Sequence, residues 1–160
     1  MLQLMNLIPE RYRDTAFVRL WAWKHIRMVF FIRPTVLELS DRRSAVRVCL
    51  NRRTRNHLGS MYFGALCVGA DLAGGLIAMR LIHRGGDHVS LVFADFSADF
   101  HKRPESDVVF TCEDGEEIAA LVERVTASGE RESIPVTVIA TAPDTFADLP
   151  VATFVLSLSL

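Results

Sequence analysis

One carboxylate interrupts the most apolar stretch of the sequence. Nearly every residue between Met61 and Met79 is apolar or small, and Asp71 is the exception. A buried carboxylate is costly unless it is paired, and this stretch offers no basic residue before Arg80. Either a hydroxyl or backbone donor from elsewhere in the fold satisfies Asp71, or Asp71 faces an apolar pocket in which its charge does chemistry.

The residues at the beginning of this stretch favour the second interpretation, in which the segment takes part in a reaction. Gly59 and Ser60 form a natural entry to a helix, with Ser60 a candidate N-cap. The backbone N–H groups of residues 61–64 then have no helical partner. They lie at the positive end of the helix dipole, where they can hold a developing oxyanion.

The two candidate groups are too far apart to act together within one chain. Phe63 and Asp71 are eight positions apart, which is about 12 Å along an α-helix. An antiparallel helix from a second copy would place its own Asp71 beside the first helix's N-terminus. We therefore expect a homodimer with the site at its interface, present twice. The hydrophobic share of 50% and the mean hydropathy of +0.23 agree with a buried subunit interface.

Length, charge and cysteine content limit the classes of protein to consider. The 160 residues fit one domain, over 1–160, and the formal net charge of -1 argues against a nucleic-acid-binding surface. Cys49, Cys67 and Cys112 lie in apolar contexts without a C-x-x-C pair, which indicates reduced core thiols in a cytoplasmic protein. Charged residues at positions 10–14 interrupt any hydrophobic region of the kind that a signal peptide needs.

The spacing of apolar residues predicts an α+β fold with an antiparallel sheet. The central helix, over about 60–82, is apolar on every side, so the sheet should wrap around it. A transmembrane helix is the weaker interpretation, because Asp71, several glycines and strand-like sequence elsewhere do not fit it. The other expected elements are a first helix over about 9–25, paired strands at 29–40 and 45–51, paired strands at 89–100 and 107–112, a short helix between Asp114 and Gly129, and paired strands at 134–142 and 151–160.

The run N-H-L-G-S-M-Y-F-G at 56–64, followed by Asp71, resembles the signature of hotdog-fold acyl-CoA thioesterases of the phenylacetate-pathway and 4-hydroxybenzoyl-CoA type. Their pattern, roughly N-x-x-G-x-x-H-G-G with an acidic residue further along the helix, is matched at Asn56, Gly59, Gly64 and Asp71. The order of elements is similar over nearly the whole chain. The resemblance implies a hotdog fold, in which a curled antiparallel sheet wraps a long central helix and the subunits dimerise through their sheets.

The resemblance also implies roles for the matching residues. Asp71 of one subunit would activate water or attack a thioester carbonyl directly. The backbone N–H of Phe63 in the other subunit, with Gly64 beside it, would polarise that carbonyl, and Asn56 would help to position water or substrate. The sequence departs from the pattern at Tyr62, which replaces the usual His, and at Phe63, which replaces the first Gly. A backbone N–H survives at Phe63, but its ring narrows the pocket or shifts the loop.

Residues around the signature are candidates for binding substrate. Gly59 and Tyr62 lie within the site loop, and Arg52, Arg53 and Arg55 lead into it. The planar donor fork of arginine binds phosphate well, and coenzyme A carries several phosphate charges. A solvated hairpin rim accounts for these arginines equally well.

Three further features have simpler explanations. Cys67 has no histidine at helical spacing to activate it and is expected to be a small core residue. His83, Asp87 and His88 surround a glycine turn and, without a second cluster of ligands, do not predict a metal site. The first helix is aromatic and basic around Trp21, and we expect it to cover the sheet or the mouth of an acyl pocket, with membrane contact as the alternative.

The sequence therefore predicts an acyl-CoA thioester hydrolase. No cofactor is expected, since coenzyme A is part of the substrate, and the protein should work as a homodimer or as a tetramer made of two dimers. One alternative is a non-catalytic protein that binds acyl-CoA or a related acyl ligand on the same fold. A less favoured one is an acyl-thioester dehydratase, which would normally use a histidine that the predicted helix lacks. Neither nucleic-acid binding nor stable membrane insertion is expected.

Overall fold

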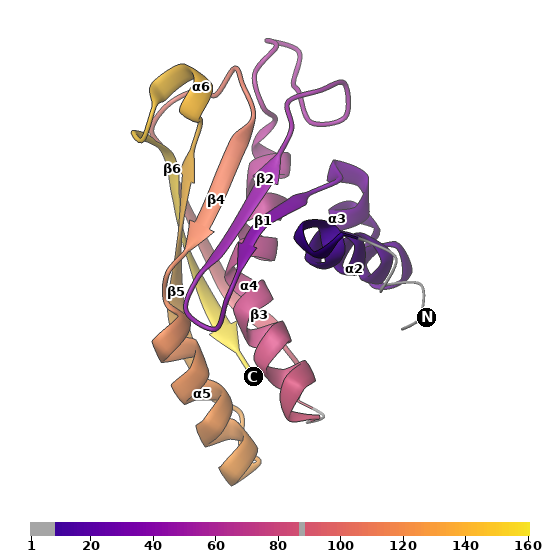
Figure 1. Ribbon diagram of the computed structural model, residues 1–160. Helices are drawn as coiled ribbons and strands as arrows, with labels where there is room; N and C mark the ends of the chain where they lie inside the picture. Colours follow the sequence, from indigo (N-terminus) through magenta and orange to yellow (C-terminus); the bar gives the residue numbers. More distant parts are fainter. Residues whose placement is uncertain (1–8, 87–88) are drawn as a thin grey trace.

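A six-stranded antiparallel sheet curls around one long helix in the computed structural model, which describes residues 9–86 and 89–160. Asp87 and His88 lie outside the described residues. The elements are α2 (Glu10–His25), α3 (Arg27–Ile32), β1 (Thr35–Leu39), β2 (Ser44–Val48), α4 (Phe63–Gly85), β3 (Val92–Phe100), β4 (Val108–Cys112), α5 (Gly115–Ser128), β5 (Ser133–Thr141), α6 (Pro143–Phe146) and β6 (Pro150–Ser159). The strand order is β1-β2-β4-β5-β6-β3. Figure 1 shows the sheet on one side of α4, with α2 and α3 on the other.

Packing, rather than helix propensity, holds α4 in place. Its glycines weaken it as an isolated helix, but they let the sheet approach closely. A Cβ atom at Gly69 would lie 2.4 Å from the ring of Phe110, so any side chain there would displace that ring. The Ser44 hydroxyl donates a hydrogen bond to the Ala73 carbonyl at 2.7 Å and ties β2 to the middle of the helix. By length and composition α4 could cross a membrane, but 61% of its most apolar stretch is buried inside the protein.

Side chains from α2 cover the β1 edge of the sheet. The Thr15 hydroxyl accepts a hydrogen bond from the Val36 N–H at 3.0 Å and donates one to the Val36 carbonyl at 3.3 Å. Arg19 donates to the carbonyls of Pro34, at 2.9 Å, and of Arg33, at 3.1 Å. These side chains take the place of a neighbouring strand for backbone groups that would otherwise stay unpaired.

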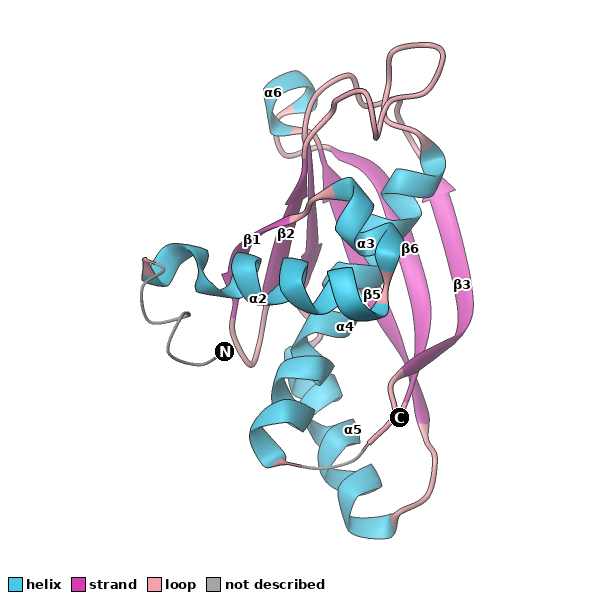
Figure 2. Ribbon diagram, turned by 90° about the vertical axis from the view of Figure 1, so that its right-hand side faces the viewer, coloured by secondary structure: helices cyan, strands magenta, loops and turns pink. Residues whose placement is uncertain are grey.

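The opposite edge of the sheet is open. Strand β3 pairs with β6 alone, and no described element lies beyond it (Figure 2). Seven of its nine residues are exposed and the other two are partly exposed. Three of the exposed side chains, Val92, Phe96 and Phe100, are large and apolar. Such an edge is a template for pairing with another strand.

The segment V-F-F-I forms part of a helix, so the predicted strand over 29–40 is wrong in its first half. These residues favour strands, which explains the error. In the structure Val29 and Ile32 face the core from α3, three residues apart, while the two phenylalanines between them are exposed. Arg33 adopts a left-handed conformation, with φ 51°, that ends α3, so the strand begins only at Thr35.

Strands β3 and β4 do not pair with each other, so the predicted pairing of 89–100 with 107–112 is also wrong. β4 lies between β2 and β5, and β3 pairs with β6 at the edge. The residues of β4 alternate between buried and partly buried, as a central strand requires, whereas β3 is exposed along its length. The rings of Phe96 and Phe100 pack on Phe154 of β6, with centroids 5.8 and 5.9 Å apart.

The remaining strand pairs and the short helix are confirmed. β1 pairs with β2, β5 pairs with β6, and α5 ends at Gly129, whose φ of 72° suits glycine. Asp114 occupies the N-cap position of α5, but its carboxylate accepts a hydrogen bond from the Thr137 N–H at 2.6 Å and does not cap the helix. Helix α4 spans 63–85 against the predicted 60–82, a shift that changes the site.

Candidate active site

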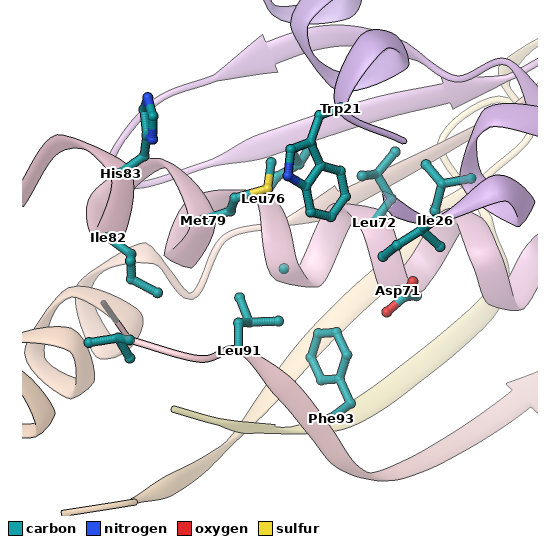
Figure 3. A pocket seen from close by; sticks show the side chains of 13 residues that line it. Trp21, Ile26, Asp71, Leu72, Leu76, Met79, Ile82, His83, Leu91 and Phe93 are labelled. Carbon is teal, nitrogen blue, oxygen red and sulfur yellow. The ribbon is translucent and has the colours of Figure 1, made fainter. Parts of the chain in front are cut away.

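Asp71 lines an apolar cavity of about 340 Å³ that lies between α4, the α2–α3 segment and the beginning of β3 (Figure 3). Trp21 and Ile26 contribute to the wall on the side of α2 and α3, and Leu91 and Phe93 on the side of β3. The Asp71 carboxylate lies between Ile26 and Phe93 in Figure 3. Hydrophobic side chains therefore surround Asp71, the one acidic group that lines this cavity within residues 9–86 and 89–160.

The Asp71 carboxylate is partly buried, and no described residue donates a hydrogen bond to it or forms an ion pair with it. Burial raises the pKa of this carboxyl above its ordinary value, because a charge loses hydration in an apolar surrounding. Of the two roles open to Asp71 from the sequence, the geometry agrees with a charge facing an apolar pocket. A carboxylate with a raised pKa is a stronger base near neutral pH than one in water.

Tyr62, not Ser60, is the N-cap of α4. The N–H of Met61 donates to the Pro104 carbonyl at 2.9 Å, and the N–H of Tyr62 donates to the Thr54 carbonyl at 2.7 Å. These two contacts hold the segment before the helix in an extended conformation, so the helix begins later than predicted. Two of the four N–H groups expected to be free are therefore engaged.

The other two N–H groups, those of Phe63 and Gly64, have no partner within the described ranges 9–86 and 89–160. They open a helix of 23 residues, at the positive end of its dipole. A Cβ atom at Gly64 would lie 2.5 Å from the Tyr62 ring, so glycine lets that ring lie against the helix start. The rings of Tyr62 and Phe63 meet edge to face at 4.8 Å, and both are about half exposed, at 48% and 58%.

Asn56 shapes the loop that leads into α4. Its Nδ2 donates to the Ser60 hydroxyl at 3.0 Å, and its Oδ1 accepts from the Leu58 N–H at 2.9 Å. Gly59 has a φ of 87°, a conformation that other residues rarely adopt. Asn56 also lines a second hollow, of about 520 Å³, together with Tyr62 and other residues at the helix start. We call this the helix-start hollow.

The predicted phosphate-binding arginines do not join either concavity. Arg52, Arg53 and Arg55 are exposed, and none of them lines the cavity beside Asp71 or the helix-start hollow. The Arg53 guanidinium lies 6.0 Å from the centre of the Phe31 ring.

Basic residues outside the signature line the helix-start hollow instead. His101, Lys102 and Arg103 follow β3 directly and reach the hollow opposite the loop of Asn56. Arg103 binds Glu105 at 2.7 Å, and the Lys102 ammonium lies 5.0 Å from the Phe146 ring centre. The run H-K-R is plain in the sequence, but only the path of the chain after β3 places it here.

The candidate site is divided within one chain. Asp71 lies in one cavity, and Phe63, Tyr62 and Asn56 line the other. The eight-position offset between Phe63 and Asp71 corresponds to about 12 Å along α4. A single thioester carbonyl cannot contact both the carboxylate and the free N–H groups of the same chain.

The sequence model of a domain of unknown function, DUF4442, matches residues 22–155. The chain belongs to the DUF4442 family. The comparison with curated proteins gives no match. This DUF4442 chain is similar in structure to a protein of unknown function from Chlorobaculum tepidum, with a TM-score of 0.77 and 12% identity over 93% of this chain and 94% of that chain.

Two other similar structures carry a provisional description as thioesterases. One, from Shewanella oneidensis, has a TM-score of 0.74 and 16% identity over 91% of this chain and 95% of that chain. The other, from Pseudomonas aeruginosa, has a TM-score of 0.71 and 19% identity over 91% and 93% of the two chains. At such identities the likeness concerns the fold. It confirms that this DUF4442 protein has the hotdog architecture that its signature predicts.

Two other candidates in the DUF4442 chain add nothing to the site. Burial raises the pKa of the Cys67 thiol, which disfavours the reactive thiolate. Among the residues that the structure describes, no three His, Cys, Asp or Glu side chains are grouped to hold a metal ion.

Proposed function

We propose that this DUF4442 protein hydrolyses acyl thioesters of coenzyme A at two sites on the interface of a homodimer. The observation that carries the proposal is the Asp71 carboxylate, which faces an apolar cavity without a partner among the described residues. The provisional description of two structural relatives as thioesterases supports the same chemistry. An apolar cavity beside a basic carboxylate suits an acyl group whose carbonyl must meet an activated nucleophile.

The open edge of β3 supplies the interface. Antiparallel pairing of β3 with its copy about a two-fold axis at Phe96 exchanges the two ends of the strand. Phe93 lines the cavity beside Asp71, and Phe100 lines the helix-start hollow. The exchange brings the cavity of one subunit towards the helix-start hollow of its partner. The Asp71 carboxylate of one subunit then lies near the free N–H groups at the start of α4 in the other.

The charges on β3 favour this register. Pairing centred on Phe96 sets Asp95 opposite Ser97 of the partner subunit. A register centred one residue later, on Ser97, would set Asp95 opposite Asp99 of the partner subunit, and like charges directly opposite each other destabilise a strand pair. The register at Phe96 also places the two Phe96 rings together across the axis.

The chemistry follows from this arrangement. Asp71 takes a proton from water as the water oxygen attacks the thioester carbonyl carbon. The carbonyl oxygen becomes an oxyanion, held by the N–H groups of Phe63 and Gly64 in the partner subunit. The C–S bond then breaks, and the coenzyme A thiolate recovers the proton from Asp71. Direct attack by Asp71, through a mixed anhydride that water hydrolyses, is the other route to the same acid and thiol.

The first test is thiol release from a panel of short, long and aryl acyl-CoAs. We expect Asp71→Asn to lower kcat/KM by about 10²- to 10⁴-fold, because the base or nucleophile is removed while the shape is kept. Asp148→Asn, which changes an exposed carboxylate in the turn before β6, should leave kcat/KM unchanged. Equal activity in wild type and Asp71→Asn would contradict the proposal.

A non-catalytic acyl-ligand-binding protein is the second candidate. The observation in its favour is the pair of exposed rings, Tyr62 and Phe63, that lie edge to face at the start of α4. Absence of turnover on every substrate, together with a rise in Tm on adding acyl-CoA, would replace the hydrolase by this candidate.

A further inference from the structure

The cavity beside Asp71 is long in one direction. The α4 side chains that line it recur on one face, at Asp71, Gly75, Met79 and His83, four residues apart. Twelve positions on an α-helix correspond to about 18 Å, so the wall runs for about that length from the carboxylate to His83. Gly75 leaves space in the middle, since even an added Cβ atom there would keep ordinary contact with Phe93, at 3.7 Å.

Among the described residues, the cavity wall has almost no polar group between its ends. Asp71 and His83 are the only titratable side chains of this described part that line it, and the Trp21 indole nitrogen is the one other polar nitrogen or oxygen of a side chain. Burying a hydroxyl or amide of a ligand without a partner is costly, so this wall disfavours polar acyl groups. A straight hydrocarbon chain has no polar group to desolvate there, and each methylene that it removes from water favours binding.

The far end of the cavity leads into another apolar hollow, beside α2, which we call the α2 hollow. This hollow, of about 490 Å³, shares Leu76, Met79 and His83 with the first cavity and continues to Phe17 and Leu20 of α2. Met79 therefore lies between the two spaces, and a change in the rotamer of its flexible side chain can connect them. The α4 arginines at the outer rim, Arg80 and Arg84, both bind Asp41, at 3.0 and 2.7 Å.

We infer that the substrate class is the long, unbranched acyl thioester, a step that rests on the proposed hydrolase function. The thioester carbonyl lies at Asp71, and the alkyl chain runs along α4 past Gly75 and Met79 towards His83. A stretched chain advances about 1.25 Å per carbon, from tetrahedral C–C bonds of about 1.5 Å, so about 18 Å of wall holds about 14 carbons. Chains longer than this continue past His83 into the α2 hollow.

Because the lining residues recur along α4, single substitutions at them should shorten the cavity and so lower the length of the longest acyl chain that fits. Gly75 is about 6 Å beyond Asp71 and Met79 about 12 Å, which correspond to about 5 and 10 carbons. Gly75→Leu should therefore restrict turnover to chains of about five carbons or fewer. Met79→Trp should set the limit near ten carbons. Ala120→Leu and Ala120→Trp are the matched controls, because they add the same side chains at an exposed position of α5 that lines neither cavity.

The experiment measures kcat/KM for saturated acyl-CoAs from 4 to 18 carbons, for wild type and the four variants. In the wild type we expect kcat/KM to rise about three- to fourfold per methylene where the chain is buried, up to about 14 carbons. The Gly75→Leu and Met79→Trp profiles should peak at the shorter lengths above, and the controls should follow the wild type. A wild-type preference for short or aryl groups, or one unchanged profile in both blocking variants, would overturn the inference.

Binding separates this inference from the hydrolase proposal. The probe is a series of non-hydrolysable alkyl thioethers of coenzyme A, titrated calorimetrically into Asp71→Asn. Affinity that grows with chain length and is cut short by Met79→Trp supports the cavity assignment, even if no acyl-CoA is hydrolysed and the hydrolase proposal fails. Affinity independent of chain length overturns the assignment, even if hydrolysis is observed.

Discussion

The two edges of the sheet are treated in opposite ways. At β1 the Thr15 hydroxyl exchanges two hydrogen bonds with Val36, and Arg19 binds the carbonyls that lead into the strand. At β3 no described side chain takes that part, although the strand is nine residues long and carries Phe96 and Phe100 on its surface. The β1 edge is therefore protected from pairing with another strand, whereas the longer and more apolar β3 edge is available for the proposed dimer.

The same contrast separates two polar side chains, the buried Thr15 and the partly buried Asp71. Thr15 lies at the closed edge, and its hydroxyl is fully engaged with the backbone of β1. Asp71 lies on the side of α4 that faces the start of β3, and no described residue pairs with it. Thr15 therefore stabilises the folded chain, whereas the unpaired Asp71 carboxylate lowers its stability, as expected of a group with the proposed catalytic role.

The largest expected effect comes from a charge at the centre of the open edge. Phe96→Lys places two ammonium groups together across the two-fold axis and should raise the dimer dissociation constant by at least about 100-fold. Thioester hydrolysis should fall with the fraction of dimer. Leu37→Lys, at an exposed position of β1, is the matched control and should change neither. Analytical ultracentrifugation over a dilution series gives the dimer dissociation constants of the wild type and of each variant. A Phe96→Lys dimer as tight as the wild type would contradict the proposal that the subunits pair through β3.

A smaller effect is expected at the closed edge. Thr15→Val keeps the shape of the side chain but removes both hydrogen bonds to Val36, and it should lower the free energy of unfolding by about 1–3 kcal/mol. Urea unfolding measures the loss, and Thr15→Ser, which retains the hydroxyl, should lose less. The oligomeric state should stay the same in both variants. A change of oligomeric state in Thr15→Val would mean that the two edges are not independent.

The smallest expected effect has the opposite sign. Because burial raises the folded-state pKa of Asp71 above the ordinary value of 3.8, the folded wild type loses stability as pH rises from 3.8 through that pKa. Asp71→Asn does not titrate, so it should be more stable than wild type at neutral pH, and the difference should vanish below pH 3.8. Urea unfolding at a series of pH values tests this, and a variant less stable than wild type at pH 7 would indicate a favourable partner for the carboxylate.

Local patterns predicted the fold class and the position of Asp71 well. The apolar run around Asp71 identifies a core helix, and a helix apolar on every side needs a sheet around it. The pairing of β3 with β6 could not be predicted from local patterns, because it depends on contacts of Phe96 and Phe100 with Phe154, more than fifty residues away. The helix start was missed for a similar reason, because the Pro104 carbonyl that engages Met61 comes from a distant loop.

The site residues divide along the same line. The positions of Asn56, Gly59 and Gly64 could be predicted because their conformations are set locally, in a loop and at a helix start. The roles of Arg52 and its neighbours, and of Lys102, depend on where a loop passes after the strand, which spacing does not encode. Short apolar segments such as V-F-F-I, at 29–32, stay ambiguous until burial selects helix or strand.

In the proposed dimer, each site takes its carboxylate from one subunit and its oxyanion donors from the other. Phe63→Pro removes one donor without breaking α4, because proline suits the first helical position, the Phe63 N–H has no partner among the described residues, and Tyr62 already has the extended conformation that precedes proline. Phe63→Ala, which keeps the N–H, is the control. Both Phe63→Pro and Asp71→Asn should be nearly inactive as pure dimers.

The decisive measurement is the hydrolysis rate of an equimolar mixture of Asp71→Asn and Phe63→Pro chains, refolded together. Half of the dimers are then mixed, and each mixed dimer has one site with both defects and one site with none. A shared site predicts recovery of about a quarter of the wild-type rate. A mixture as inactive as its two parents, with mixed dimers present by mass spectrometry, would contradict the shared site.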